Sequence, residues 1–522
     1  MSTSSDTEKH AGSGIHPTNS HGLGEFVDVD AHKLQEMGYA QDMRRKYSVL
    51  SVLGVGFSLT NSWWAVSTAF VTGISSGGSA LLVYGTILLF VVSIGVAVSL
   101  SELVSALPNA AGQSFWAREL APKAWSRQAS YIAGWLVWAG SIFACASVAS
   151  AVGSGCVGSY ALSHPDFAPK PWHTFVAYQV MNIFCSLFNC YGKVLPAVGQ
   201  ACLYTSLVSF IVILIAVPAK AETHTSPKFV FATFINWTGW SSDGMAFIVG
   251  LINANWGFSC LDTAVHLAEE IQQPEKMIPI AILGVIGIGF VTSFAFILSM
   301  MFSVQSVDDF LSASVPSLEL FYQALRNKAG ATVLEALVIA TGIGCMISCH
   351  TWASRLLWSF SRDRGVPLHQ LWSRVHPVFE VPLNAHMLNT LITAAVGCIY
   401  LGSSTAFNAM VTACIVFPYL SYAIPIAALL IRGRKNIKPG PFWTGRFGFV
   451  CNVVALAWIL FTFVFYSFPT YLPATGGNMN YVSVIYGILF FIVVTDWFAR
   501  GKKSYRSSTL QHDDGDHAAV GL

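Results

Sequence analysis

The feature that most constrains this chain is a series of long apolar segments that occupies most of its length. Each segment is near or above the ~20 residues that an α-helix needs to cross about 30 Å of hydrocarbon. Lipid cannot satisfy free backbone groups, and runs of this length favour helices over the strands of a barrel. The sequence therefore predicts an all-α integral membrane protein with twelve transmembrane helices. We place them near residues 47–72, 78–106, 128–158, 172–191, 194–218, 243–267, 278–303, 332–358, 384–402, 405–431, 447–468 and 480–499.

The composition excludes several other classes of protein. Hydrophobic residues make up 54% of the 522 residues and charged residues only 10%, whereas a soluble domain has about 25% charged residues. The net charge of +2 gives no sign of a nucleic-acid partner. The partners that we expect are the lipid bilayer and a small-molecule substrate, and the oligomeric state stays open.

The cysteines and histidines form no recognisable metal or redox motif. The 11 cysteines lie almost entirely inside apolar segments, where they are typical of small buried hydrophobes and not of a disulfide framework. No CxxC pair, HExxH pattern or nucleotide-binding motif is present. We therefore expect no metal, no cofactor, no enzymatic activity and no ATP drive.

The distribution of basic residues predicts the orientation of the chain. With twelve spans both termini lie on one side, and 23 of the 28 Lys and Arg residues then fall on that side, against five on the other. By the positive-inside rule, the side rich in basic residues faces the cytosol. We predict a disordered cytosolic tail at 1–46, a transporter-like membrane domain at 47–499 and a cytosolic tail at 500–522, in a multi-pass protein of the plasma membrane.

One N-glycosylation pattern is present, at Asn236-Trp237-Thr238. It lies between the fifth and sixth spans, on the predicted outer face. Asn236 is therefore a candidate glycosylation site, although a lone acceptor so close to a span is often unused.

Spans one and six each contain an interruption at mid-depth. Span one has a pair of glycines followed by the polar cluster Thr60-Asn61-Ser62, and span six has small and polar residues between 250 and 262. Unwound backbone exposes groups that lipid cannot satisfy, so it must line a cavity. Matched interruptions predict a substrate site built from two discontinuous helices. The alternative is that the small residues allow close helix packing.

The candidate site residues lie in and beside these interruptions. The aromatic rings there, which include Trp64, can cage a quaternary ammonium by cation–π contacts, because such a group has no N–H to donate. Trp256 is the strongest candidate because it lies within the break, and packing in the core or against lipid is the alternative for the others. The predicted substrate-binding residues are Thr60, Asn61, Ser62, Trp63, Asn255, Trp256, Phe258 and Asp262.

Ionisable residues inside the spans are candidates for gating and coupling. Asp262 either neutralises a cationic substrate, carries a proton, or is held by local hydrogen bonds. Glu102 lies closer to the inner face, where a role in the inner gate or in structure is expected. Together with Trp256, these residues are the gate or coupling candidates, and the coupling ion, H⁺ or Na⁺, stays open.

Three groups of residues resemble the amino acid–polyamine–organocation transporter superfamily, in the same order along the chain. They are Ser101-Glu102-Leu103 with Pro108-Asn109-Ala110-Ala111-Gly112-Gln113, then Ala268-Glu269-Glu270 with Pro274-Glu275-Lys276, then Ser354-Arg355-Leu356 with Arg362-Asp363-Arg364-Gly365 and His376-Pro377. The chain looks most like the fungal amino acid/choline transporter branch, which includes choline and 4-aminobutyrate permeases. This narrower resemblance rests on residues 54–57, 59–63, 73–78 and 255–270.

The resemblance implies a fold of two inverted five-helix repeats, at about 47–218 and 243–431, with two peripheral helices at 447–499. It also implies a site between spans one, three, six, eight and ten, with an aromatic gate that Trp256 matches. Some members carry a lysine within span five in place of a coupling sodium ion. Here Lys193 only precedes span five, which contains no lysine.

These observations favour a secondary transporter that imports a small organic cation or an amino acid by alternating access, with a choline-like substrate preferred. The alternatives are an amino acid or 4-aminobutyrate permease, a transporter of a secondary-metabolite precursor or product, and a nutrient sensor that binds without transporting.

Overall fold

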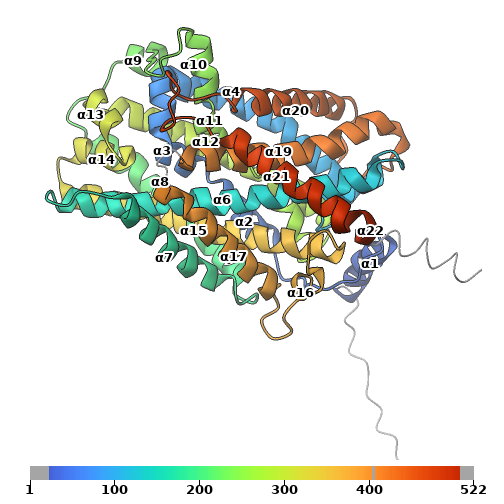
Figure 1. The fold of residues 1–522 in the computed structure, drawn as a ribbon. Coiled ribbons are helices and arrows are strands. Elements are labelled where there is room, and N and C mark those ends of the chain that lie inside the picture. The colour runs from blue at the N-terminus through green and yellow to red at the C-terminus, as the bar shows by residue number, and fades with distance from the viewer. Residues whose placement is uncertain (1–22, 403–405, 506–522) are drawn as a thin grey trace, which may run out of the picture.

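The computed structural model describes residues 23–402 and 406–505, and the regular secondary structure of these residues is helical (Figure 1). The one exception within them is an isolated parallel bridge between Tyr47 and Ile271. Nine helical segments of the described chain are long and apolar enough to cross a membrane. They correspond to α2 with α3 (Val49–Thr60, Ser62–Thr68), α4 (Phe70–Ala106), α6 (Ser126–Ser163), α8 (Leu195–Lys220), α12 (Pro274–Ser303), α15 (Lys328–Arg362), α19 (Ala406–Arg432), α20 (Arg446–Phe465) and α21 (Val482–Asp496) with the turns that follow it. The all-α, multi-pass class is confirmed.

The spans predicted fourth, sixth and ninth are shorter or interrupted helices. The fourth is α7 (Pro171–Phe188), and the ninth is α17 (Leu383–Gly397) followed by α18 (Ile399–Gly402). The sixth consists of α10 (Asp243–Gly250) and α11 (Ile252–Trp256), after which no regular helix forms until the short 3₁₀ helix η1 (Val265–Leu267). Length and composition alone therefore support nine spans in the described chain.

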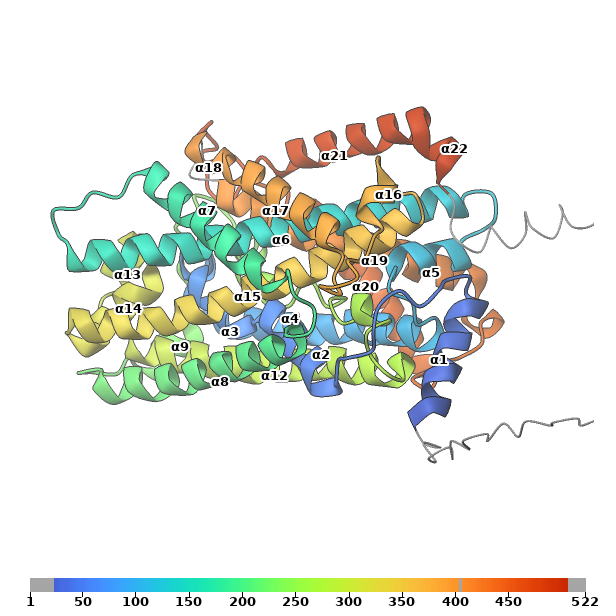
Figure 2. The same cartoon turned by 90° about the horizontal axis from the view of Figure 1, so that it is seen from below.

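The long helices run side by side, and short helices gather at the two ends of the bundle (Figure 2). One end, which we call the α1 end, carries α1 (Leu23–Glu36), α5 (Gln113–Leu120), α16 (His369–Trp372) and α22 (Lys502–Ser504). The opposite end, the α14 end, carries α9 (Pro227–Ala232), α13 (Val307–Ser312) and α14 (Pro316–Leu325). The first and last described helices thus lie at the same end, as expected for an even number of spans.

Burial divides the helices into a core and a periphery. Helix α6 packs against α15, α19 and α7 in the core. By contrast, α21 lies at the edge of the bundle and exposes the large apolar side chains of Ile488, Phe490 and Phe491. An apolar surface of this kind is unusual in contact with water and is expected against lipid tails.

The N-terminal region differs from the sequence prediction of a disordered tail through residue 46. Residues 23–36 form α1, and the segment after it packs on the α1 end of the bundle. Its anchors are the side chains of Leu34, Tyr39 and Met43, which are buried. Three buried side chains among ten residues leave the mean hydropathy of the segment low. The composition of this region therefore did not indicate that it packs on the bundle. Residues 1–22 and 506–522, for which the sequence predicts cytosolic tails, lie outside the described residues.

Candidate functional site

A single residue in the left-handed conformation interrupts the first membrane-spanning segment. Asn61, between α2 and α3, has φ 30° and ψ 66°. Non-glycine residues rarely adopt this conformation, and Asn is among those that tolerate it best. The Asn61 side-chain amide donates to Ser206 Oγ of α8 at 3.0 Å, and Trp63 Nε1 donates to the same hydroxyl at 3.0 Å. Asn61 and Trp63 therefore face the fifth predicted span.

The second break is longer, and it touches the first. After α11 ends at Trp256, residues 257–264 form turns in place of a helix. Ser62 Oγ donates to the Gly257 carbonyl oxygen at 2.5 Å. A Cβ on Gly257 would come within 2.8 Å of Ser62 Cα, so glycine is required for this close approach of the two backbones. The two interruptions predicted from the sequence lie side by side.

Trp64 and Trp256 form an aromatic pair where the two breaks meet. Their ring centroids are 5.6 Å apart, with an interplanar angle of 51°. Trp64 Nε1 donates to the Val338 carbonyl oxygen of α15 at 3.0 Å, which fixes that ring. Gly342 leaves room for it, since a Cβ there would stand 2.8 Å from Trp64 Cζ2. Both rings are buried, so the structure is closed at this point, and separation of the rings would present aromatic faces to a cation.

Asn255 connects the broken helix to the tenth and eleventh predicted spans. Tyr419 Oη of α19 donates to Asn255 Oδ1 at 2.9 Å, and Asn255 Nδ2 donates to Tyr466 Oη, at the end of α20, at 3.0 Å. Tyr419 Oη also lies 3.5 Å from the Phe258 carbonyl oxygen. These contacts hold the start of the second break against α19 and α20.

Asp262 is fully buried within a network of hydrogen bonds. Tyr422 Oη donates to its Oδ1 at 2.5 Å, Gln113 Nε2 donates to its Oδ2 at 2.7 Å, and His266 Nε2 lies 2.9 Å from the same Oδ2. His266 Nδ1 lies 2.7 Å from the Ala110 carbonyl oxygen. A carbonyl oxygen only accepts, so Nδ1 carries a proton. The contact between Nε2 and Oδ2 then requires one further proton, shared by Asp262 and His266.

The second and third groups of residues that carry the superfamily resemblance meet at the α1 end. Arg355 of α15 forms a bidentate ion pair with Glu270, at 2.9 and 3.3 Å, and Arg362 pairs with Glu269. Lys46 Nζ lies 3.6 Å from Glu270 Oε2. Burial lowers the pKa of the Lys46 ammonium and raises the pKa of the Glu269 carboxyl, against the opposing effect of their ion-pair partners. These ion pairs, which we call the α1-end lock, join the loop after the second break to α15.

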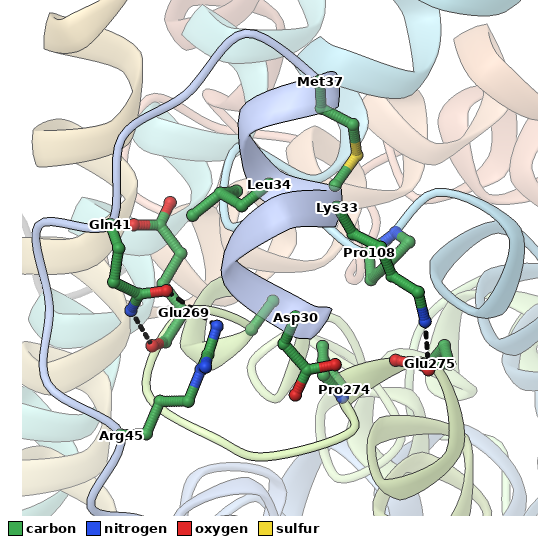
Figure 3. Close-up of a pocket in the computed structure, with 11 residues that line it drawn as sticks. Asp30, Lys33, Leu34, Met37, Gln41, Arg45, Pro108, Glu269, Pro274 and Glu275 are labelled. Atoms are coloured by element: carbon green, nitrogen blue, oxygen red, sulfur yellow. Dashed lines mark hydrogen bonds and ion pairs between the residues drawn. The ribbon is translucent and has the colours of Figure 1, made fainter. Parts of the chain in front are cut away.

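The N-terminal segment covers the same loop (Figure 3). Lys33 of α1 forms an ion pair with Glu275 at 2.8 Å, and Gln41 Nε2 donates to the Glu269 carbonyl oxygen at 2.8 Å. Between α1 and this loop a cavity of about 20 Å³ remains, and a second cavity of about 340 Å³ lies between α1 and the connection from α19 to α20. The α1 end is therefore closed by both ion pairs and packing.

Glu102 and Asn236 make their contacts elsewhere. Arg434 donates two hydrogen bonds to the buried Glu102 carboxylate, at 2.7 and 2.9 Å, and Thr444 N donates a third at 2.7 Å. Glu102 thereby anchors the connection between α19 and α20. At the α14 end, Asn236 Nδ2 donates to the Trp240 carbonyl oxygen at 2.9 Å, and its glycosylation stays a prediction.

The eight predicted substrate-binding side chains are all buried, but they do not face one common centre. Ser62 and Trp256 lie where the breaks meet, whereas Thr60 Oγ1 donates back to the Gly56 carbonyl oxygen at 3.1 Å. The sequence reasoning missed Tyr419, Tyr422 and Gln113. The nearest sequence signal for the two tyrosines is a pair of prolines within α19, at positions 418 and 425.

Comparison with known proteins assigns the chain to a family. The amino acid permease profile matches residues 47–491. The choline transporter of Saccharomyces cerevisiae is 48% identical over 485 residues, which cover 91% of this chain and 84% of the relative. The 7-keto 8-aminopelargonic acid transporter of the same yeast is 34% identical over 508 residues, with coverages of 85% and 90%. The transmembrane transporter swnT of Metarhizium robertsii is 35% identical over 464 residues, with coverages of 89% and 92%.

These relatives are named as transporters, and none of the three is named as an enzyme. The profile extends over both broken segments and over the segments that carry Glu269, Glu270, Arg355 and Arg362 of the α1-end lock. The superfamily resemblance drawn from the sequence is confirmed: the chain belongs to the amino acid permease family and is a membrane transporter.

Proposed function

We propose that this permease imports choline, or a small organic cation like it, across the plasma membrane by alternating access. The observation that carries the proposal is the pair of rings of Trp64 and Trp256 where the two breaks meet. A quaternary ammonium donates no hydrogen bond, so aromatic faces are the groups suited to recognise it. The 48% identity to a yeast choline transporter supports the same class of substrate.

We infer twelve spans arranged as two inverted repeats of five, at about 47–218 and 243–431, with two further helices at 447–499. The lengths of corresponding helices favour this arrangement. The third and eighth spans are α6 with 38 residues and α15 with 35, and the fifth and tenth are α8 with 26 and α19 with 27. The fourth and ninth are the short helices α7 with 18 and α17 with 15, and the first and sixth are both broken.

The α1 end is the cytosolic side in this proposal, and the α14 end is the outer side. The excess of basic residues on the side of the termini supports this orientation. Import then requires the α1-end lock to open after the substrate has entered from the α14 end. Arg355–Glu270 and Arg362–Glu269 are the contacts that must break and re-form in each cycle.

We further propose that a proton drives import and is carried by the Asp262–His266 pair. The pair holds one shared proton beside the second break, within contact of α19 through Tyr422 and of α5 through Gln113. Rearrangement of the broken segment would change these contacts and thus the affinity for the proton. The predicted fifth span, residues 194–218, contains no lysine that could replace a coupling ion, because Lys193 precedes α8 and Lys220 is the last residue of that helix.

The second candidate is an amino acid or 4-aminobutyrate permease, which the family assignment favours. Such a substrate carries a carboxylate, whereas choline does not. The two candidates therefore differ in the ligands that they recognise. An amino acid permease requires a carboxylate on the ligand, whereas a choline transporter does not.

The test is radiolabelled choline uptake in a permease-deficient yeast, with 4-aminobutyrate and several amino acids as competitors. We expect saturable uptake that these compounds do not inhibit. The variant Trp256→Ala is expected to raise KM about thirtyfold, because a desolvated cation–π contact contributes about 2 kcal/mol, and Trp256→Phe is expected to lose less. The control is Trp172→Ala, which removes a ring of α7 that is 54% exposed. Inhibition by amino acids, or an unchanged KM in Trp256→Ala, would contradict the choline proposal.

A further inference from the structure

A cavity of about 190 Å³ lies at the α14 end, between α3, α6, the start of α14 and α15. It is smaller than the ~300–1,000 Å³ pockets that hold drug-sized ligands, so it suits a ligand of a few heavy atoms. Most of its polar lining consists of hydroxyl groups. The lining residues are Thr68, Ser150, Ala151, Ser154, Gly155, Ser314, Val315, Pro316, Ser317 and Glu335.

Among the described residues that line the cavity, Glu335 is the one that can carry a charge. It lies seven residues after the start of α15, about 10 Å along the helix at 1.5 Å per residue, and it is only 2% exposed. Its Oε2 accepts a hydrogen bond from Ser317 Oγ at 3.0 Å. Its Oε1 accepts none from the described residues, and none of the described Lys, Arg or His residues forms an ion pair with Glu335.

A carboxylate in such a place is costly unless a positive charge accompanies it. Gly155 of α6 keeps the space beside it free, since a Cβ on Gly155 would stand 3.2 Å from Glu335 Oε1. A carboxyl oxygen that accepts no hydrogen bond from the described residues, in a cavity of this size, is a group suited to a cationic ligand. For packing alone, an apolar side chain or a glutamine would serve better.

The floor of the cavity is connected to the central aromatic pair. Thr68 Oγ1, in the cavity wall, donates to the Trp64 carbonyl oxygen at 3.1 Å. Trp64 Nε1 donates to the carbonyl oxygen of Val338, which lies one helical turn after Glu335 in α15. The Trp64 ring in turn packs against Trp256. A ligand in the cavity would thus lie next to the residue that closes the central site.

We propose that this cavity is a second, outer binding site for small organic cations, with Glu335 as the counter-charge, where a cation is held before the Trp64–Trp256 pair opens. The inference rests on the proposed function and extends it to a separate site. None of the described residues that line the cavity is aromatic, so the site recognises charge and not methyl groups. It therefore accepts primary and quaternary ammonium ions alike, and selection between them belongs to the aromatic pair.

The first test measures choline uptake by Glu335→Gln, which keeps the shape of the side chain and removes its charge. We expect KM to rise about tenfold with little change in the maximal rate, and Glu335→Asp to lie between wild type and Glu335→Gln. The matched control is Asp308→Asn, which neutralises an exposed carboxylate in α13 at the same end. A KM within twofold of wild type in Glu335→Gln would overturn the proposal. So would a loss of concentrative accumulation with unchanged KM, since this would make Glu335 a proton site.

The second test does not depend on transport. Ser154→Cys places a thiol in the cavity wall, and Cys156→Ser removes the nearest native cysteine in sequence. The modification rate of residue 154, followed by mass spectrometry, is compared for methyl methanethiosulfonate and its trimethylammonium-ethyl analogue. We expect Glu335→Gln to lower the ratio of the cationic to the neutral rate about tenfold. An unchanged ratio would overturn the outer site. A failure of wild type to transport choline, with this preference intact, would instead contradict the proposed function.

Discussion

At the scale of single residues, the shared proton of Asp262 and His266 leads to a specific prediction. In Asp262→Asn the new amide can donate to His266 Nε2, so the fold is expected to persist, but the pair can no longer exchange a proton. We expect concentrative choline uptake to fall at least about tenfold, which corresponds to 1.4 kcal/mol of lost driving force. Exchange of external for internal choline is expected to stay within about twofold, because it needs no net proton transfer. Accumulation at the wild-type level would exclude Asp262 as the proton carrier.

The same residue shows how far sequence reasoning reaches. A carboxylate in an apolar span is visible in the sequence, and its cost in such a place makes it a candidate for function. Its partners Gln113 and Tyr422 are 149 and 160 residues away along the chain, and no periodicity connects them. Trp63 and Trp64 show a second limit, because adjacency in sequence does not place two side chains on one site. Helical geometry directs the ring of Trp63 toward α8 and the ring of Trp64 toward α15.

At the scale of secondary-structure elements, the α1-end lock is expected to contribute to stability as well as to gating. Arg355 and Glu270 are almost fully buried, so removal of one partner leaves an uncompensated charge. Arg355→Gln or Glu270→Gln alone is expected to cost about 3–5 kcal/mol of unfolding free energy. The double variant should recover part of that loss, because no unpaired charge remains in that pair. Thermal unfolding of the detergent-solubilised protein measures the cycle.

The surface ion pair between Arg326 and Glu222 provides the control for this cycle. Its side chains are 69% and 60% exposed, and Arg326→Gln is expected to change the unfolding free energy by less than about 1 kcal/mol. Equal losses at the two pairs would contradict the structural role of the lock.

The elements of the lock were visible in the sequence as family-like segments, but their pairing was not, because it depends on how α15 packs against the loop that follows the second break.

At the scale of the whole molecule, the number of spans cannot be derived from helix length alone. Nine helices of the described chain pass a length and composition criterion, and an odd number would place the termini on opposite sides. Helices α1 and α22 nevertheless lie at the same end of the bundle. If the shorter helices α7 and α17 and the broken segment from α10 to η1 also cross the membrane, as we propose, the count rises from nine to the twelve spans predicted from the sequence. Hydropathy detected these three segments where a helix criterion fails, because apolar content persists where a helix is short or unwound.

The proposed twelve-span topology predicts which loops are accessible to glycosylation. In an Asn236→Gln background, Ser312→Asn creates an acceptor next to Ser314 at the α14 end, and Ala124→Asn creates one next to Ser126 at the α1 end. We expect an endoglycosidase-sensitive mobility shift only for Ser312→Asn, because the side that carries only five of the basic residues is the outer face.

Tags on both termini should resist protease in intact spheroplasts. Cleavage of one tag alone would require an odd number of spans, and cleavage of both, with a glycan at position 124, would require the inverted orientation. An inverted orientation would place the Glu335 cavity on the cytosolic face, and an odd number of spans would remove the basis for assigning it to the outer face. Both follow because the assignment depends on the orientation of α15.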